Sequence, residues 1–175
     1  VNDAEYAAIG AEIVDNAPDI FSRAEMIVKV KEPQAVERAM LREGQVLFTY
    51  LHLAPDPDQT RDLIDSGATC IAYETVTSPH GGLPLLAPMS KVAGRMAIQA
   101  GAYCLEQPHG GLGMLLGGVP GVDPAKVVIL GAGVVGTHAT HIAVGMGADV
   151  WVIDPNPKRF ETHCRQSGPS PNTYF

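Results

Sequence analysis

The chain has 175 residues, enough for one large domain or parts of two, and 46% of them are hydrophobic while 18% are charged. This balance is typical of an ordinary globular protein and excludes a disordered or fibrous one. The formal net charge of −7 argues against a nucleic-acid partner, because binding to phosphate backbones depends on Lys and Arg. Small molecules are therefore the expected partners.

Location and redox state are predicted from the absence of the usual signals. No apolar run reaches the ~20 residues of a membrane helix and no basic, apolar leader opens the chain, so we expect a cytoplasmic protein without membrane contact. Cys70, Cys104 and Cys164 are odd in number and scattered, which predicts reduced thiols and no zinc site. Because the chain begins at Val1 inside a predicted helix and stops soon after a nucleotide-binding strand, we expect both ends to be cut.

The first half of the chain predicts a β-α-β alternation. In chain order we expect a short helix and a short apolar strand within 2–14, a helical turn at 20–23, strands at 26–31, 45–53 and 69–76, and a helix at 58–66 between the last two strands. In the 26–31 strand, Lys29 and Lys31 share one face. Asp56 or Asp58 is expected to cap the 58–66 helix, which Gly67 ends.

The second half predicts a long helix followed by a nucleotide-binding unit. We expect a helix at 91–106 that joins two domains, a strand at 126–130, a helix at 134–146 and a strand at 149–153. The glycine-dense stretch 110–121 indicates a hinge or a close approach of backbones. The predicted fold is therefore α/β. Residues 1–86 form a substrate domain with a parallel sheet, and residues 87–175 form a linker helix and a Rossmann domain that is truncated after its second strand.

A glycine loop joins the 126–130 strand to the helix after it. In the sequence Gly131-Ala132-Gly133-Val134-Val135-Gly136, the first glycine permits a tight turn, the second lets the backbone approach a pyrophosphate, and the third lets helix and strand pack. The phosphates meet the positive end of the helix. Asp154 ends the next strand about 18 residues after Gly136, where an acid accepts hydrogen bonds from ribose and repels the extra phosphate of NADP. This pattern predicts NAD binding.

Two residues of the first half are candidates for catalysis. Lys31 and His52 lie at or near the carboxyl ends of predicted strands, where ligands collect in open α/β sheets. An ammonium can hold a carbonyl or carboxylate oxygen, and an imidazole can exchange a proton near physiological pH. Taken alone, each has an ordinary interpretation, since a lysine at a strand end is often a solvated charge and a histidine among apolar residues is often part of the core.

Other groups of polar residues are interpreted as structural. His138 and His141 lie one helical turn apart without a matching carboxylate or cysteine, which favours ordinary helix-surface residues over a metal site. A set of acids spreads along the 58–66 helix in the manner of a solvated face, namely Asp56, Asp58, Asp62 and Asp65.

Several segments together resemble the alanine dehydrogenases in order and spacing. They are Val28-Lys29-Val30-Lys31-Glu32-Pro33, Leu47 to Ala54 (LFTYLHLA), Ala72 to Val76 (AYETV), Leu85 to Ser90 (LLAPMS) and Gly117 to Val122 (GGVPGV), followed by the glycine loop. The resemblance implies oxidation of L-alanine by NAD and water to pyruvate and ammonium, in a homohexamer. It also implies that Lys31 binds the substrate, His52 is the general acid/base, Ser90 lies beside the cofactor phosphates, and the backbone of Val134 and Val135 follows the pyrophosphate.

The chain departs from this family at several places. The family's substrate-carboxylate arginine and catalytic aspartate have no counterpart in the sequence. Lys91 stands where Glu is usual, Leu112 where Arg is usual, and His138 where Asn is common. Beyond Pro157 the resemblance weakens, and Gly168, Pro169 and Pro171 interrupt an expected helix.

Two other functions remain open at this point. One is the NAD-binding part of a proton-translocating transhydrogenase, which passes hydride between nucleotides; the setting of His52 favours the dehydrogenase. The other is a truncated product that retains nucleotide binding or an oligomer interface without catalysis. We expect the 175 residues alone to oxidise alanine weakly or not at all.

Overall fold

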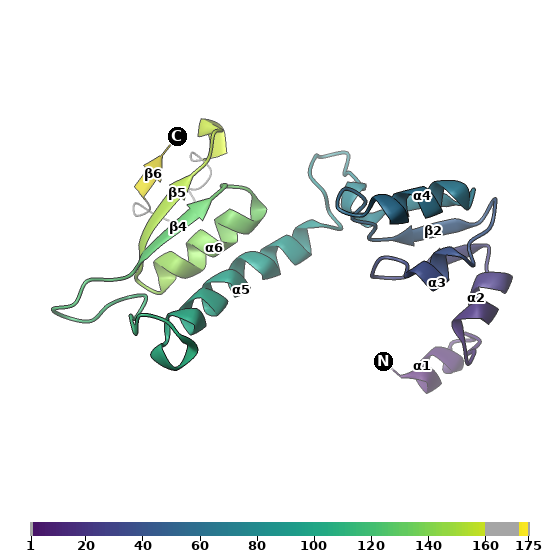
Figure 1. The fold of residues 1–175 in the computed structure, drawn as a ribbon, viewed down its shortest axis with the longest axis horizontal. Helices are drawn as coiled ribbons and strands as arrows, with labels where there is room; N and C mark the ends of the chain where they lie inside the picture. The colour runs from purple at the N-terminus through teal and green to yellow at the C-terminus, as the bar shows by residue number, and fades with distance from the viewer. Residues whose placement is uncertain (1, 160–171, 175) are drawn as a thin grey trace. The chain divides into compact units, whose positions relative to one another are not determined.

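The computed structural model describes residues 2–159 and 172–174, and the chain divides into two compact units, Val1–Leu86 and Ala87–Phe175. Each unit contains a three-stranded sheet in which every pair of neighbouring strands is parallel (Figure 1). Each also has its own hydrophobic core. The predicted α/β class with parallel sheets is confirmed.

The sheet of the first unit has the order β1-β2-β3. Its strands are β1 (Met26–Val28), β2 (Val46–Thr49) and β3 (Thr69–Ala72), with α3 (Ala35–Arg38) and α4 (Pro57–Asp65) as crossovers. The central strand β2 pairs on both sides, with Leu47 opposite both Ile27 and Cys70, and Leu47 is fully buried. The core around it consists of Phe21, Ile27, Leu41, Leu47, Leu51 and Leu63.

Several predicted elements of this unit differ in length from the observed ones. Two short helices, α1 (Asp3–Ala8) and α2 (Ala17–Arg23), precede the sheet, but residues 11–14 form no strand, so that expectation was wrong. The strands at 26–31, 45–53 and 69–76 shorten to three or four residues, and the last continues as a 3-10 turn, η1 (Tyr73–Thr75). A strand extends only as far as the neighbouring strands offer backbone hydrogen-bond partners. The length of an apolar run in the sequence does not reveal where those partners end.

The helix α4 forms as predicted. Asp56 caps it by accepting a 2.9 Å hydrogen bond from the backbone N–H of Gln59, and Gly67 beyond its end has a φ of 67°. A side-chain cap and a left-handed glycine are local signals, so the sequence alone predicts this helix well.

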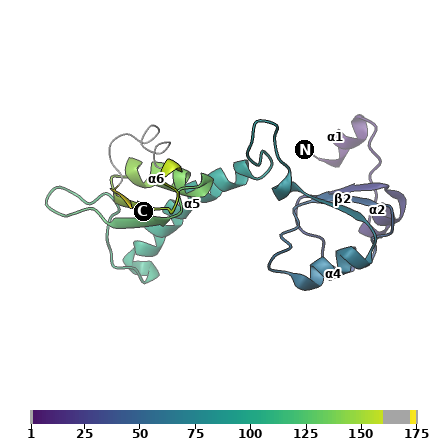
Figure 2. The same ribbon diagram turned by 90° about the horizontal axis from the view of Figure 1, so that it is seen from above.

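The second unit begins with the long helix α5 (Ala87–Leu105) and the short 3-10 helix η2 (Gln107–His109). The strand β4 (Lys126–Leu130), the helix α6 (Val134–Gly145) and the strand β5 (Asp149–Ile153) follow. The helices α5 and α6 lie side by side in both views (Figure 1 and Figure 2). A Cβ added at Gly94 of α5 would overlap the carbonyl oxygen of Val135 in α6, so glycine is needed for this close packing.

The sheet of this unit has the order β4-β5-β6 and does not stop at its second strand. The strand β6 (Asn172–Tyr174) pairs with β5 in parallel, which corrects the expectation of two strands. A three-residue strand far along the chain offers too little periodicity to be predicted. The expected interruption by Gly168, Pro169 and Pro171, and the thiol of Cys164, lie outside the described residues.

The glycine-dense stretch 110–121 is a close approach of backbones. Cβ atoms added at Gly111, Gly117 or Gly118 would overlap backbone oxygens of Cys104, Met146 or Val122, respectively. Of the two alternatives that the sequence left open, close approach is confirmed at these three positions. None of the helices in the described part of the chain is both long and apolar enough to cross a bilayer.

Candidate functional site

The glycine loop lies between β4 and α6, and its three glycines have different environments. Gly131 has a φ of 97° and its N–H donates to the carbonyl of Ile153 at 2.7 Å, which forms the tight turn. A Cβ at Gly136 would overlap the carbonyl oxygen of Gly131, so the third glycine is required by packing. Gly133 is different, because a Cβ there would meet nothing within 4 Å. The second glycine therefore faces open space, where a ligand can approach the backbone.

The N-terminus of α6 provides an anion-binding end. Gly133 is its N-cap and contributes no side-chain cap to the helix of 12 residues that starts at Val134. The first N–H groups of a helix have no partner within the helix, and the macrodipole makes this end positive. A phosphate group fits such a terminus.

A cavity of about 1090 Å³ adjoins this helix end. It is lined by every glycine of the loop, by Val134 and Val135, and by Ser90 of α5, together with mainly apolar side chains. The geometry of the loop, the uncapped helix end and an apolar cavity of this size fit a dinucleotide, with phosphates at the helix and rings in the cavity.

Asp154 follows β5 and holds the loop from within the protein. Its carboxylate accepts 2.7 Å hydrogen bonds from the N–H groups of Ala132 and Asn156 and a 2.9 Å bond from the guanidinium of Arg159. The side chain is only 1% exposed. The bond from Ala132, then that from Asn156, and then the Arg159 contact lower the pKa of this carboxyl, against the opposing effect of burial. The predicted hydrogen bonds to ribose stay a prediction.

In the first unit, His52 lies just beyond β2 in an uncommon backbone conformation. Its φ is 45°, in the left-handed region, and Glu74 holds this turn by accepting hydrogen bonds from the N–H groups of Leu51 at 3.1 Å and His52 at 2.7 Å. The imidazole is 45% exposed, and its Nδ1 contacts the Glu32 carboxylate. The backbone conformation and the Glu32 carboxylate together fix the orientation of the ring. A histidine that only fills the core would not need such an arrangement.

Lys31 lies three residues beyond β1, in a loop and not in the strand as predicted. The Thr49 hydroxyl donates to the Lys31 carbonyl at 2.8 Å, which holds this loop next to the end of β2. Lys29 forms an ion pair with Glu37 at 2.5 Å, whereas Lys31 is exposed and no side chain among the described residues pairs with it. Its ammonium is therefore available to a ligand.

Glu32 and Glu74 are site residues that we did not single out from the sequence. Both occur in segments that carry the family resemblance, but nothing in their spacing predicts contact with His52. A hydrogen bond to its own backbone and then the contact with His52 lower the pKa of Glu32, with a further contribution from the charge of Lys31. The Glu32 carboxylate thus contacts His52 and also responds to the charge of Lys31.

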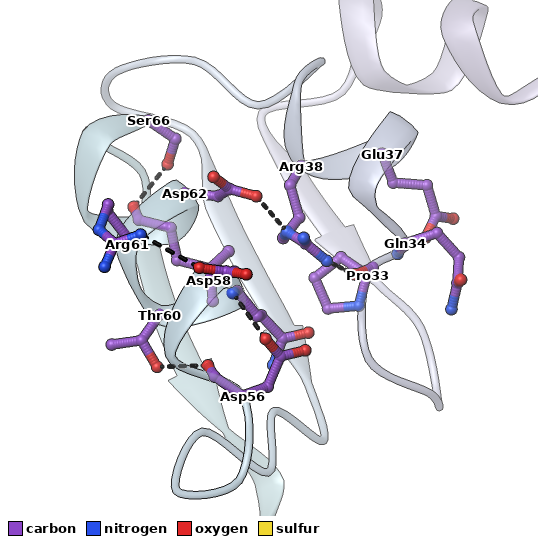
Figure 3. Close-up of polar contacts among 12 residues, drawn as sticks. Pro33, Gln34, Glu37, Arg38, Asp56, Asp58, Thr60, Arg61, Asp62 and Ser66 are labelled. Carbon is purple, nitrogen blue, oxygen red and sulfur yellow. Dashed lines mark hydrogen bonds and ion pairs between the residues drawn. The ribbon is translucent and has the colours of Figure 1, made fainter.

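A second cavity, of about 320 Å³, lies beside His52. Glu32, His52 and Arg38 line it, and Lys31 does not. The Arg38 guanidinium is held between helices by Asp62 of α4 at 2.8 Å and by the Pro33 carbonyl at 3.0 Å (Figure 3). Asp58 and Asp62 are exposed, in keeping with the predicted solvated face, but Asp62 also anchors α3 to α4 through Arg38.

His138 and His141 of α6 are also less ordinary than predicted. Their rings lie 5.9 Å apart, and His138 Nδ1 and His141 Nε2 are buried without a hydrogen-bond partner in the described part of the chain. Burial, and then the nearby charges of Arg95, His141 and Lys91, lower the pKa of His138. Both side chains are half-buried, and His138 lies where α6 packs on Gly94 of α5, while the described residues include no cluster of three potential metal ligands.

Comparison with known proteins decides the family. The model of the alanine dehydrogenase/PNT N-terminal domain matches residues 1–93, and that of the C-terminal domain matches residues 97–170. The chain belongs to the alanine dehydrogenase/PNT family. The resemblance predicted from the sequence segments is thus confirmed.

Relatives within this family are similar over most of the chain. Alanine dehydrogenases of Halomonas elongata and Methanococcus maripaludis are both 58% identical, over 92% and 91% of the chain and 43% of each relative. Alanine dehydrogenase 2 of Staphylococcus aureus is 52% identical over 91% of the chain and 42% of that relative. The chain spans about two fifths of the length of these curated relatives.

Solved structures agree with this family assignment. The structure of an L-alanine dehydrogenase matches 98% of this chain with 51% identity and a TM-score of 0.83. The match covers 47% of the chain of that dehydrogenase. The structure of the transhydrogenase of Sinorhizobium meliloti matches 100% of this chain with 25% identity and a TM-score of 0.75. The match covers 51% of the chain of that transhydrogenase. Both members of the family share the fold, and the dehydrogenase has twice the identity.

Proposed function

We propose that this chain is part of an alanine dehydrogenase that converts L-alanine, NAD⁺ and water into pyruvate, ammonium, NADH and a proton. The observation that carries the proposal is a glycine loop with dinucleotide-binding geometry in a chain that is 51% identical to an L-alanine dehydrogenase over 98% of its length. Small-molecule substrates follow from this activity. A cytoplasmic location and assembly into a homohexamer are part of the same proposal.

In the second unit, NAD is held by the loop and the start of α6. The N–H groups of Val134 and Val135 meet the pyrophosphate. The backbone that the pyrophosphate approaches is shaped by the loop residues Gly131, Ala132, Gly133 and Gly136. Ser90 adds a hydroxyl, and Asp154 holds Ala132 in place. When bound, NAD supplies the acceptor for the hydride that leaves Cα of the substrate.

In the first unit, Lys31 and His52 act on the substrate. The free ammonium of Lys31 holds a carboxylate or carbonyl oxygen, and the exposed imidazole of His52 exchanges a proton as amine becomes imine and then ketone. The Glu32 contact at Nδ1 orients the ring and leaves Nε2 to face the substrate. Glu32 is thus a positioning residue.

The transhydrogenase function receives less support. The lower identity to the solved transhydrogenase and the carboxylate-held His52 both favour chemistry on a keto acid. In the oligomer that contains this chain, NADH oxidation driven by pyruvate and ammonium should exceed that driven by a nicotinamide nucleotide analogue. The reverse order would establish the transhydrogenase function instead.

The cofactor proposal is tested by calorimetric titration of the chain with NAD. Gly133→Ala should weaken NAD binding by about tenfold or more, because the new methyl group occupies the space into which the pyrophosphate approaches. Gly145→Ala is the matched control, since a Cβ at this other end of α6 also meets nothing within 4 Å. Equal NAD affinity in Gly133→Ala and the wild type would contradict the proposed site.

A further inference from the structure

Among the described residues, one hydrogen bond joins the segment 77–86 to the rest of the first unit. The Tyr50 hydroxyl donates to the carbonyl of Leu85 at 2.6 Å, across 35 positions in the chain. The other hydrogen bonds described for this segment join its own residues, as between the Leu86 N–H and the Leu83 carbonyl at 3.1 Å. Tyr50 therefore supplies the contact that fixes the segment where it leaves the first unit.

The ring of Tyr50 is buried and held by aromatic neighbours. Tyr50 is 7% exposed, and the ring of Tyr73 meets its ring edge-on, with centroids 4.9 Å apart and planes at 86°. The ring of Phe48 meets Tyr73 in the same way, at 4.2 Å. The Tyr50 N–H donates to the Val30 carbonyl at 3.2 Å, which holds the backbone beside the sheet. A buried hydroxyl needs a hydrogen-bond partner, and the Leu85 carbonyl provides it.

The same ring stacks on the imidazole of His52. The two centroids are 6.0 Å apart and the planes differ by 15°, which is an offset stack. One rigid side chain thus has its hydroxyl at the Leu85 carbonyl and its ring against the predicted acid/base. A movement of Leu85 that carries the hydroxyl with it also turns the ring plane against which the imidazole lies.

The contact also lies at a particular place in the chain. Leu85 is two residues before Ala87, where α5 begins, and Ser90 of α5 lines the cavity beside the glycine loop. The short linker between these residues therefore connects the Tyr50 contact with the helix that contributes to the proposed NAD site.

We infer that Tyr50 is a positioning residue, which ties the orientation of the His52 imidazole to the conformation of the linker at residues 83–86. The inference rests on the proposed function, in which His52 exchanges the proton. Glu32 contacts the Nδ1 atom of the imidazole, and Tyr50 sets the tilt of its plane. His52 is thus in position for proton exchange only while the linker keeps the conformation that the Tyr50 hydroxyl holds.

Nuclear magnetic resonance of the isotope-labelled chain tests this coupling through Tyr50→Phe, which removes the hydroxyl and keeps the ring. The Cε1–Hε1 signal of His52, assigned by its loss in His52→Gln, should shift, because the ring that stacks on the imidazole is no longer anchored. Hydrogen exchange at the Leu86 N–H should become about two- to tenfold faster, as expected when one hydrogen bond of ordinary strength is lost.

Tyr73→Phe is the matched control, because it belongs to the same aromatic cluster and its hydroxyl donates no hydrogen bond within the described part of the chain. It should leave both signals as they are in the wild type. Circular dichroism establishes that each variant is folded. An unchanged His52 signal in Tyr50→Phe, with or without faster exchange at Leu86, or equal effects of the two substitutions, would overturn the inference.

These measurements need no turnover, so the inference and the proposed function fail separately. Wild-type rates of alanine oxidation in an oligomer that carries His52→Gln would contradict the proposed role of His52. The coupling of its ring to the linker would then stand as a structural property of the first unit.

Discussion

At the scale of single residues, carboxylates whose contacts the sequence does not predict organise the first unit. Glu74 accepts the backbone N–H groups of Leu51 and His52 and so holds the left-handed turn that presents the imidazole. Burial opposes ionisation of Glu74, but hydrogen bonds from its own backbone, His52 and Leu51 together lower its pKa. The position of His52 thus depends on a residue 22 positions away in the chain.

Glu74→Ala should destabilise the first unit by about 1–3 kcal/mol, because it leaves two backbone donors, one of them partly buried, without an acceptor. Glu74→Gln keeps an oxygen acceptor and should cost less. Urea unfolding, followed by far-ultraviolet circular dichroism, measures both. Equal stability of the alanine variant and the wild type would show that water replaces the carboxylate.

At the scale of elements, the packing of α5 on α6 determines how the second unit is built. Gly94 permits the backbones to approach, and His138 lies at the same crossing. The charges that act on His138 from α5 are those of Lys91 and Arg95, and its titratable neighbour on α6 is His141. Lys91 and His138 are both positions at which the sequence is expected to depart from the family pattern.

Gly94→Ala should destabilise the second unit by about 1–3 kcal/mol, because its methyl group overlaps the Val135 carbonyl and forces the helices apart. Gly101→Ala lies two turns along the same helix, where a Cβ meets nothing within 4 Å, and should stabilise the helix by about 0.5–1 kcal/mol. Denaturant titration of the two variants measures this contrast. Changes of the same sign in the free energy of unfolding for both variants would contradict close packing at Gly94.

Acid should destabilise the α5–α6 packing. The folded state lowers the pKa of His138 below its ordinary value of 6.5, so the unfolded chain takes up a proton first as the pH falls. Stability is therefore complete above about pH 6.5 and is lost as the pH falls through the lowered pKa. The midpoint of thermal unfolding should be lower at about pH 5 than at about pH 7.5. This difference between the two midpoints should be smaller in His138→Asn than in the wild type. An identical drop in the variant would assign the acid sensitivity to other groups.

At the scale of the whole molecule, two separate cores and open sheet edges set the behaviour of the chain. Within the described residues, β4 pairs with β5 on one side only, and its last residue, Leu130, is 79% exposed. An unpaired edge next to apolar side chains favours pairing with another chain.

We expect the chain to associate as its concentration rises, as measured by sedimentation velocity. Leu130→Lys should reduce this association, since a charge on an edge strand opposes pairing. Val36→Lys is the control, because Val36 is similarly exposed, at 73%, but lies in α3 and not at a sheet edge. A chain that is monomeric at all concentrations, or two variants with equal effects, would contradict the prediction.

Taken by itself, the sequence determined the features whose signals are local. The strand β4, the glycine loop, α6, β5 and the cap of α4 were predicted to within a residue or two, because turns, caps and periodicity act between near neighbours. Only the tertiary structure decided the lengths of the first three strands, the addition of β6, the contact of Glu32 with His52 and the burial of Asp154 behind Arg159. These features depend on partners that are distant in sequence, or on whether a side chain faces the interior. Residue type alone reveals neither the distant partners nor the direction of the side chain.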